Sequence, residues 1–461
     1  MIHFLSNAMC AEGIDPAVFE RIVPSQFLSF SFPNPLASPG NPYADTLRVA
    51  VADSPSSTTS NPSPPAIAAV LVPHRREDDW VFSTAAGHFQ LLLFLSSPKL
   101  TISRLVLIGD LPSPSSSLPR PYSRSQPDGG GKLLDCFQES LIPLLLALCP
   151  KAAFLNGVPT IPFLSYEDDV ISSTPVERLV GPTAGEMLVE DVEIDLSPSS
   201  PELRRRLRFK KMPNLIQTQV RLLPESVDAG IFRPEMGSLV QPYLSPMVSA
   251  LFLNASAIDD AFGCGCVPWI LCVGVGGGAL LASLRCRFGF RVLGVEADDV
   301  VLSVARRHFG LVEGEFLKVV VDDGIKLIED YALERSNGNL FHAIMVDLDE
   351  EDPMNGIGAP PAEFLQMSVL VGARMALHPE GILVVNVIPS NESLYANMIK
   401  LFQKVFCELY ELKVEDEENF VIIATVSPIG SVAKKMKKQG GIYEKLKQLD
   451  CERFIDCIKK T

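Results

Sequence analysis

The sequence of 461 residues has no apolar run long enough to cross a bilayer. The longest candidates, residues 91–95 and 141–148, are far shorter than the roughly 18 residues that a membrane helix needs. Basic residues are in the minority, with 40 Lys and Arg against 55 Asp and Glu and a formal net charge of −15. An acidic chain repels polyanions, so we expect neither nucleic acid nor a membrane surface as a partner. The N-terminal stretch MIHFLSNAMCAEG has no basic segment followed by a long apolar core, so we expect no secretory signal.

The ten cysteines form no pattern typical of disulfides or of metal binding. Cys264 and Cys266 are too close together for a comfortable bridge, and Cys272 falls inside an apolar, strand-like run. The sequence contains no CxxC pair and no His-x-x-x-His. We therefore expect no disulfide framework and no metal site, and a reducing, cytoplasmic location.

The first third of the chain predicts a small α/β unit. Two stretches rich in Pro, Ser and Gly, residues 53–66 and 112–131, cannot bury enough apolar surface to become ordered, and we expect them to be disordered loops. Short β-branched runs lie at 66–73 and 105–109, and helical patterns at 85–95 and 133–149. We expect residues 1–179 to form an accessory domain.

Residues 180–235 alternate apolar and charged side chains, which predicts a β-meander with one solvated face. Its basic cluster has two interpretations: a docking patch for an acidic partner, or an exposed strand face protected against edge pairing. The cluster consists of Arg204, Arg205, Arg206, Arg208, Lys210 and Lys211.

Residues 236–430 alternate apolar strands with helical segments, which predicts a parallel sheet covered on both faces. The expected strands lie at 269–273, 291–296, 317–322, 342–347 and 381–387. Two further strands, 408–414 and 420–426, have no helix between them and predict a terminal antiparallel hairpin. The basic tail, 431–461, has the apolar spacing of an amphipathic helix, either packed on the domain or free for interaction.

The chemistry-bearing residues follow the strands of this sheet. Gly274, Gly276 and Gly278 come directly after the first strand, where glycines let the backbone approach a ligand. Glu296 ends the second strand, where a carboxylate accepts both ribose hydroxyls of NAD or of S-adenosylmethionine (SAM). The third strand ends in Asp322-Asp323-Gly324 and the fourth in Asp347. So many acids at one sheet edge suit a cationic cosubstrate, which favours SAM over NAD.

These motifs resemble the class I SAM-dependent methyltransferases, in their spermidine-synthase-like branch. More closely, the chain is similar to the C-terminal half of the eukaryotic methyltransferases that modify elongation factor 1-alpha on a lysine and at its N-terminus. The resemblance covers nearly the whole chain and is carried by PSQFLSFSFP, VPHRREDDWVFSTAAGHFQL, NLIQTQVRLLP, CVGVGGGALL, GVEAD, DDGIKLI, IMVDLDEEDPMNG and HPEGILVVNVI.

The resemblance implies a Rossmann-like α/β fold, SAM as cofactor and a protein N-terminal α-amine as substrate, with elongation factor 1-alpha as a possible partner. It places the three glycines at the methionine end of SAM, Glu296 at the ribose, and Asp323 with Gly324 at the adenine. Asp347, together with Asp349, would face the reacting amine. The preceding lysine-methylating half of the family has no counterpart before residue 236, so we do not expect lysine methylation.

Two other functions stay open at this point. Spermidine synthases carry an acid inside the glycine loop, where this chain has Gly277, and this departure disfavours aminopropyl transfer. A non-catalytic scaffold that keeps the fold is the second alternative, although such a protein has no physical need for the glycines, Glu296 and Asp323.

Overall fold

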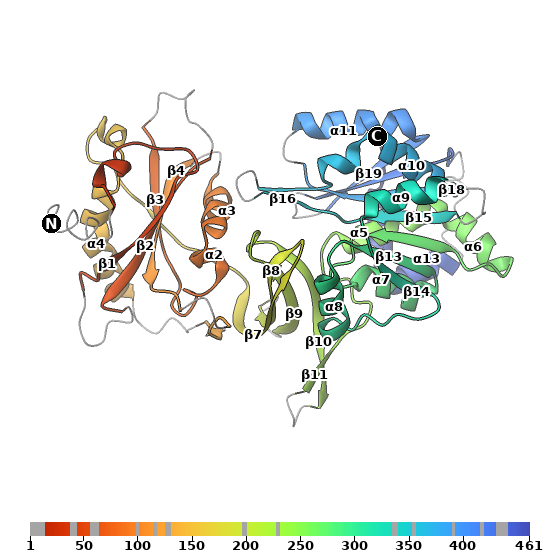
Figure 1. The fold of residues 1–461 in the computed structure, drawn as a ribbon, viewed down its shortest axis with the longest axis horizontal. Coiled ribbons are helices and arrows are strands. Elements are labelled where there is room, and N and C mark those ends of the chain that lie inside the picture. The colour runs from red at the N-terminus through yellow and green to blue at the C-terminus, as the bar shows by residue number, and fades with distance from the viewer. Residues whose placement is uncertain are drawn as a thin grey trace.

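The computed structural model describes residues 14–36, 44–55, 64–97, 101–113, 118–124, 131–195, 201–226, 231–333, 340–352, 356–389, 392–414, 419–429 and 441–461. Three sheets follow one another along the chain, and the middle one lies between the other two (Figure 1). In this part of the chain, no helix combines the length and apolar character needed to cross a membrane.

The N-terminal unit is a five-stranded mixed sheet with helices on both faces. Its strands, in spatial order, are β1 (Phe27–Pro33), β2 (Thr46–Asp53), β4 (Ile102–Asp110), β3 (Ala66–Leu71) and β6 (Phe163–Leu164). Helix α4 (Gly131–Ala147) packs on one face, and α2 (Trp80–Ser83) with α3 (Ala85–Leu95) on the other. Short 3-10 turns, η1 (Pro16–Phe19) and η2 (Lys151–Phe154), complete the unit. The fully buried Arg104 pairs with Asp53 at 2.6 Å and donates to the carbonyls of Phe19 and Leu148, which ties the sheet to both ends of the unit.

The middle sheet is antiparallel throughout. Its strands, in spatial order, are β11 (Ile231–Pro234), β10 (Ile216–Ser226), β9 (Glu202–Phe209), β8 (Gly185–Ile194), β7 (Val170–Gly181) and β5 (Tyr122–Ser123). The expected domain boundary at residue 179 falls inside β7, which already begins at Val170 and pairs with β8 along its length. Strand β5 lies within the expected loop 112–131, where pairing with β7 orders residues that have no periodicity of their own. Most of the two loop stretches (56–63, 114–117 and 125–130) lies outside the described residues.

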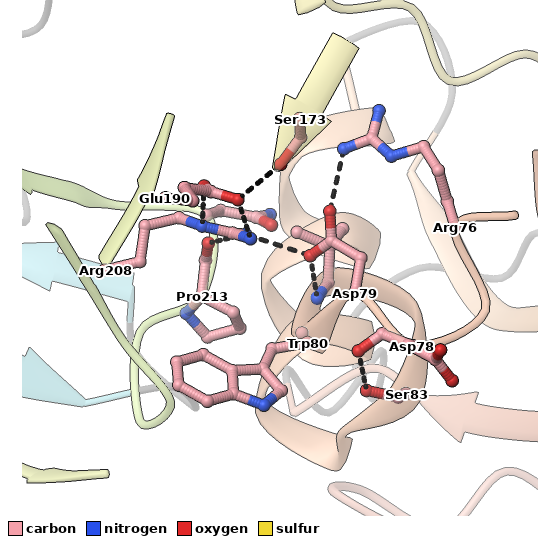
Figure 2. A network of polar contacts seen from close by, with 12 residues as sticks. Arg76, Asp78, Asp79, Trp80, Ser83, Ser173, Glu190, Arg208 and Pro213 are labelled. Carbon is pink, nitrogen blue, oxygen red and sulfur yellow. Dashed lines mark hydrogen bonds and ion pairs between the residues drawn. The ribbon is translucent and has the colours of Figure 1, made fainter. Parts of the chain in front are cut away.

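The expectation of a solvated face on this sheet is wrong. One face packs its apolar side chains on helix α8 (Asp299–His308) of the next unit. The other face meets the N-terminal unit through charged pairs such as Arg208 with Asp79, and Arg208 also pairs with Glu190 of the neighbouring strand β8 (Figure 2). The basic cluster is therefore no exposed patch, because its arginines, Arg206 excepted, and Lys210 pair with carboxylates of the same chain.

The C-terminal unit is an eight-stranded sheet covered on both faces, as expected. Its strands, in spatial order, are β14 (Leu317–Val321), β13 (Arg291–Glu296), β12 (Trp269–Val273), β15 (Phe341–Val346), β18 (Leu377–Val387), β20 (Phe420–Thr425), β19 (Glu408–Lys413) and β21 (Lys459–Lys460). The first five strands are parallel to one another, and each of the last three pairs antiparallel with the strand before it in this order. The predicted fold class, a Rossmann-like α/β sheet of the class I type ending in an antiparallel hairpin, is confirmed.

The covering elements form two layers. One apolar core contains α5 (Leu244–Ser249), η3 (Ala250–Asn254), α6 (Ala255–Gly263), α7 (Ala279–Ser283), the π-helical turn η4 (Leu284–Phe288), α13 (Gly441–Gln448) and η7 (Glu452–Cys457). The opposite core contains α9 (Gly324–Leu333), η6 (Ala362–Leu365), α10 (Met367–Ala376) and α11 (Glu392–Val405). A small hairpin, β16 (Glu350–Asp352) with β17 (Gly356–Gly358), follows β15. The described part of the predicted tail, residues 441–461, packs on the domain, because Ile442 and Leu446 are fully buried; residues 431–440 lie outside the described residues.

Candidate functional site

A cavity of about 190 Å³ lies where β12, β13, β14 and β15 end, and the middle sheet forms its opposite wall. Parallel strands present their carboxyl ends at one edge, which is where open α/β sheets bind ligands. The described lining contains five carboxylates and one lysine, so the cavity suits a cationic ligand. These charged residues are Glu296, Asp298, Asp322, Asp347, Asp349 and Lys211.

The loop after β12 is built for close approach of backbone to backbone. Gly274 has φ +87°, and a Cβ atom at this position would lie 2.1 Å from the carbonyl oxygen of Asp347. At Gly276, which has φ +51°, the nearest atoms to such a Cβ are 3.8 Å away, so this glycine leaves cavity space that a side chain would fill. At Gly274, the steric overlap excludes any residue with a Cβ atom. At both Gly274 and Gly276, the positive φ angle favours glycine.

The carboxylate of Glu296 holds this loop in place. One of its oxygens accepts hydrogen bonds from the backbone N–H groups of Val275 (3.2 Å) and Gly276 (3.3 Å), and the other accepts from that of Asp298 (3.2 Å). Burial raises the pKa of Glu296 above its ordinary value of 4.5, although the three hydrogen bonds oppose this shift. The side chain thus positions the loop and lines the cavity at once.

The raised pKa of Glu296 predicts opposite pH dependences for stability and for ligand binding. The folded state binds the proton more tightly than the unfolded state does. The resulting stabilisation is therefore fully present below the ordinary pKa of 4.5, and it is lost as the pH rises through the higher pKa of the folded state. Affinity for S-adenosylhomocysteine is expected to rise over the same window, because the ribose hydroxyls, which the resemblance places at Glu296, would donate to its charged form.

Urea denaturation and calorimetric titration of the wild type and of Glu296→Gln, from about pH 4 to about pH 8, test this expectation. The Gln variant lacks the titrating group, so the wild type should lose stability relative to it with rising pH. A constant difference between the two proteins would contradict the assignment.

Asp347 lies at the end of β15 in a fixed hydrogen-bond network. The Tyr243 hydroxyl donates to its Oδ2 atom and the Asn386 amide to its Oδ1 atom, both at 3.0 Å. Asn419 in turn donates to the Oδ1 atom of Asn386 at 2.8 Å, and both asparagines are buried. Burial raises the pKa of Asp347, while the two hydrogen bonds favour its charged form. The carboxylate is oriented from two sides, which leaves its remaining lone pairs for a donor in the cavity.

Asp298 connects the site to the middle sheet. Its Oδ1 atom accepts from the N–H of Val300 at 2.9 Å and so caps α8. Its Oδ2 atom accepts from Thr183 (2.9 Å) and Ala184 (2.8 Å) in the turn between β7 and β8. Gly181 permits this contact, since a Cβ there would lie 2.3 Å from the same oxygen. The sheet is thereby fixed over the cavity.

The structure brings six of the eight predicted site residues to this one cavity: Gly274, Gly276, Glu296, Gly324, Asp347 and Asp349. The other two, Gly278 and Asp323, are not among its lining residues. Gly278 packs against the Leu311 side chain, and the Asp323 carboxylate caps α9 by accepting from the N–H of Ile325 at 2.8 Å. The neighbouring Asp322 lines the cavity instead.

Several lining and supporting residues escaped the sequence reasoning. Phe209, Lys211 and Gln217 reach the cavity from the middle sheet, and no motif connects that sheet with the glycine loop. Tyr243 likewise carries no signal. Asn386 does carry one, because it is a polar residue inside the apolar strand β18.

Comparisons with known proteins find similarity to the same proteins that the sequence motifs resemble. No family model matches the chain. The eEF1A lysine and N-terminal methyltransferase of Xenopus laevis is 28% identical over 377 residues, which cover 76% of this chain and 50% of that protein. The human protein of the same name is 26% identical over 388 residues, covering 78% and 50%. The chain spans about half the length of the curated relatives it matches, and the predicted resemblance is confirmed.

Solved structures are similar over shorter parts of the chain. Human methyltransferase-like protein 13, in complex with SAH, aligns over 47% of this chain and 93% of its own, with 26% identity and a TM-score of 0.40. A probable spermidine synthase from Corynebacterium glutamicum aligns over 58% and 89%, with 14% identity and a TM-score of 0.40.

Proposed function

We propose that this chain is a SAM-dependent methyltransferase that modifies the N-terminal α-amine of a protein, with elongation factor 1-alpha as the candidate substrate and the cytoplasm as its location. One observation carries the proposal: Glu296 and the oriented Asp347 flank the glycine loop in a single cavity. The similarity to curated protein methyltransferases supports it.

The residues present fit SAM. Glu296 offers a carboxylate to the ribose hydroxyls, and Asp322 with Gly324 lies at the next strand end, on the side proposed for the adenine. The backbone of Gly274 and Gly276 is open to the amino acid end of the ligand. When bound, SAM supplies a methyl group on a cationic sulfur, and the acidic lining suits that charge.

The proposed role of Asp347 is to orient the incoming amine. An α-amine has a pKa near 7.7–8.0 and is partly neutral at physiological pH, whereas a lysine near 10.4 is not. Little base catalysis is therefore needed, and the main requirement is alignment of the nitrogen with the methyl carbon. The fixed Asp347 carboxylate accepts a hydrogen bond from the amine, with Asp349 close by in the lining.

The packing around Gly277 argues against aminopropyl transfer. A Cβ atom at this position would lie 2.6 Å from the Thr218 hydroxyl oxygen and 3.1 Å from the Phe309 ring. The space that an acid in this loop would need is thus occupied by β10 and by the end of α8.

A transfer assay with isotope-labelled SAM tests the proposal. The purified chain is incubated with elongation factor 1-alpha that has a free N-terminus, and mass spectrometry locates the label. We expect label on the α-amine and none on an otherwise identical substrate whose N-terminus is acetylated. Binding of S-adenosylhomocysteine is measured in parallel by calorimetry.

The outcomes separate the alternatives. Binding without transfer would reject elongation factor 1-alpha as the substrate of this chain and keep the SAM site. If neither binding nor transfer is observed, the proposed enzyme is rejected and a scaffold that retains the fold is favoured.

A further inference from the structure

A second cavity, of about 340 Å³, lies between the N-terminal unit and the middle sheet. It is separate from the candidate SAM site because successive side chains of a strand point to opposite faces. Arg206 and Arg208 of β9 line this cavity, whereas Phe209 and Lys211 line the other one. Five arginines and five carboxylates are among its described lining residues: Arg75, Arg76, Arg120, Arg206, Arg208, Asp79, Glu167, Asp168, Asp169 and Glu190.

Two of the buried arginines are fully paired. Arg76 contacts Asp79 at 2.9 Å and Asp168 at 2.5 Å, and it lies over the Tyr166 ring. Arg208 contacts Asp79 at 2.9 Å and Glu190 at 2.7 Å, as Figure 2 shows. These neighbours raise the pKa of both arginines. These two arginines already have carboxylate acceptors and therefore do not require a ligand.

Arg206 differs from its neighbours. It is half-buried, yet among the described residues it has no ion pair, and its buried Nε atom has no hydrogen-bond partner. Burial lowers the pKa of Arg206 to about 10; Glu190, its cross-strand neighbour, and Asp168 partly oppose this shift, and the nearby Arg208 and Arg204 add to it. A guanidinium carries five N–H donors in one plane. Burying it without an acceptor has an unfavourable free energy.

Asn214 forms part of the wall of the same cavity. Its backbone N–H donates to the Gln90 side chain of α3 at 3.0 Å, so the residue is held in position. The Oδ1 atom of Asn214 is itself buried and presents no surface to the cavity. The cavity therefore offers the cationic donor Arg206 beside apolar side chains such as Leu188 and Val192.

We propose that this cavity is a second ligand site, which takes the carboxylate of an acidic ligand on the terminal N–H groups of the Arg206 guanidinium. A single negative charge fits better than a phosphate, because five carboxylates already line the cavity and repel a more highly charged group. Ligands with a single carboxylate and no further charge include acylated amino acids and peptides with one acidic side chain. Both are covered by this chemistry.

Calorimetric titration of the full chain with two matched pairs of compounds tests the proposal and identifies the source. The small-molecule pair is N-acetylglycine and N-acetylglycinamide; the peptide pair is a blocked pentapeptide of alanines with a central glutamate or a central glutamine. We expect the acid of one pair to bind at least about tenfold more tightly than its amide, the energy of one charge-assisted hydrogen bond. The pair that shows this difference identifies the ligand as a small acid or as a peptide.

Arg206→Gln and Arg221→Gln then test the location. Both remove one positive charge from the middle sheet, but Arg221 lies outside the cavity, in an exposed pair with Glu202. Arg206→Gln should abolish the preference for the acid, and Arg221→Gln should keep it. Equal binding of acid and amide, no binding in either pair, or acid binding that survives Arg206→Gln would each overturn the proposal.

Thermal unfolding provides an independent readout. Since Arg206 has no ion pair to lose in the described chain, Arg206→Gln should leave the melting temperature unchanged or raise it. The acidic ligand should raise the melting temperature of the wild type only. A marked loss of stability in Arg206→Gln would show a structural partner for this arginine and overturn the proposal. S-adenosylhomocysteine binding, at the other cavity, should be the same in both variants.

Discussion

Replacing Asp347 with asparagine is expected to lower the turnover of methyl transfer by about 100-fold, the typical effect of a misplaced reacting group. The affinity for S-adenosylhomocysteine should change less than about threefold. Asparagine keeps the shape of the side chain, and the Tyr243 hydroxyl can turn to accept from the new amide. The variant thus removes the charge that is proposed to orient the amine and retains the hydrogen bonds to Tyr243 and Asn386.

Steady-state kinetics and calorimetry on the same preparations measure the two quantities. The matched control is Asp330→Asn, which removes one carboxylate from the exposed side of α9. It should leave both quantities unchanged. A large loss of affinity with unchanged turnover would make Asp347 a ligand of the cofactor and not a residue that orients the substrate.

Substituting alanine for Gly274 is expected to reduce the affinity for S-adenosylhomocysteine by about 100-fold and the free energy of unfolding by about 3 kcal/mol. Two effects add at this position. Alanine is disfavoured at φ +87°, and its Cβ would overlap the carbonyl oxygen of Asp347 at 2.1 Å. Relief of the overlap must move the loop or the end of β15, and both line the cavity.

Gly289→Ala separates the two effects. Gly289 ends the turn η4 with φ +79°, and no described atom lies within 4 Å of a Cβ at this position. The control should lose about 1 kcal/mol of stability through conformation alone, with unchanged binding. Equal losses of affinity in the two variants would show that the close approach to Asp347 is not what shapes the site.

Strands β12, β13 and β15 of the C-terminal sheet were predictable because each is a mostly apolar run that ends in an acid or directly before an acid or a glycine. The expected strand at 269–273 is β12, and the one expected at 342–347 is displaced by a single residue in β15. Strand β5 was not predictable, since two residues have no periodicity and only pairing with β7 defines them. The ion pairs that cover the middle sheet also arise from packing, as Arg208 meets Asp79 across 129 residues of sequence.

The residues of the candidate site were likewise predictable only in part. Glu296 and Asp347 follow from the rule that parallel strands end at one edge, so their meeting was predictable. Tyr243 was not, because it lies 104 residues before the carboxylate it contacts. The choice between Asp322 and Asp323 depends on which of the two caps α9, and adjacent residues with the same side chain carry no sequence signal for that.

The position of Asp298 also determines how a substrate can enter. One carboxylate, 2% exposed, accepts from Val300 in α8 and from Thr183 and Ala184 in the middle sheet. Hydrogen bonds to a charged group contribute about 1.5–3 kcal/mol each, so lifting the sheet would break two of them and leave a buried charge poorly solvated. The middle sheet is therefore a fixed roof over the cavity and not a hinged lid. Under the proposed function, a protein terminus would enter beneath this sheet from the rim, and a narrow, flexible chain end would fit there better than a side chain on a folded surface.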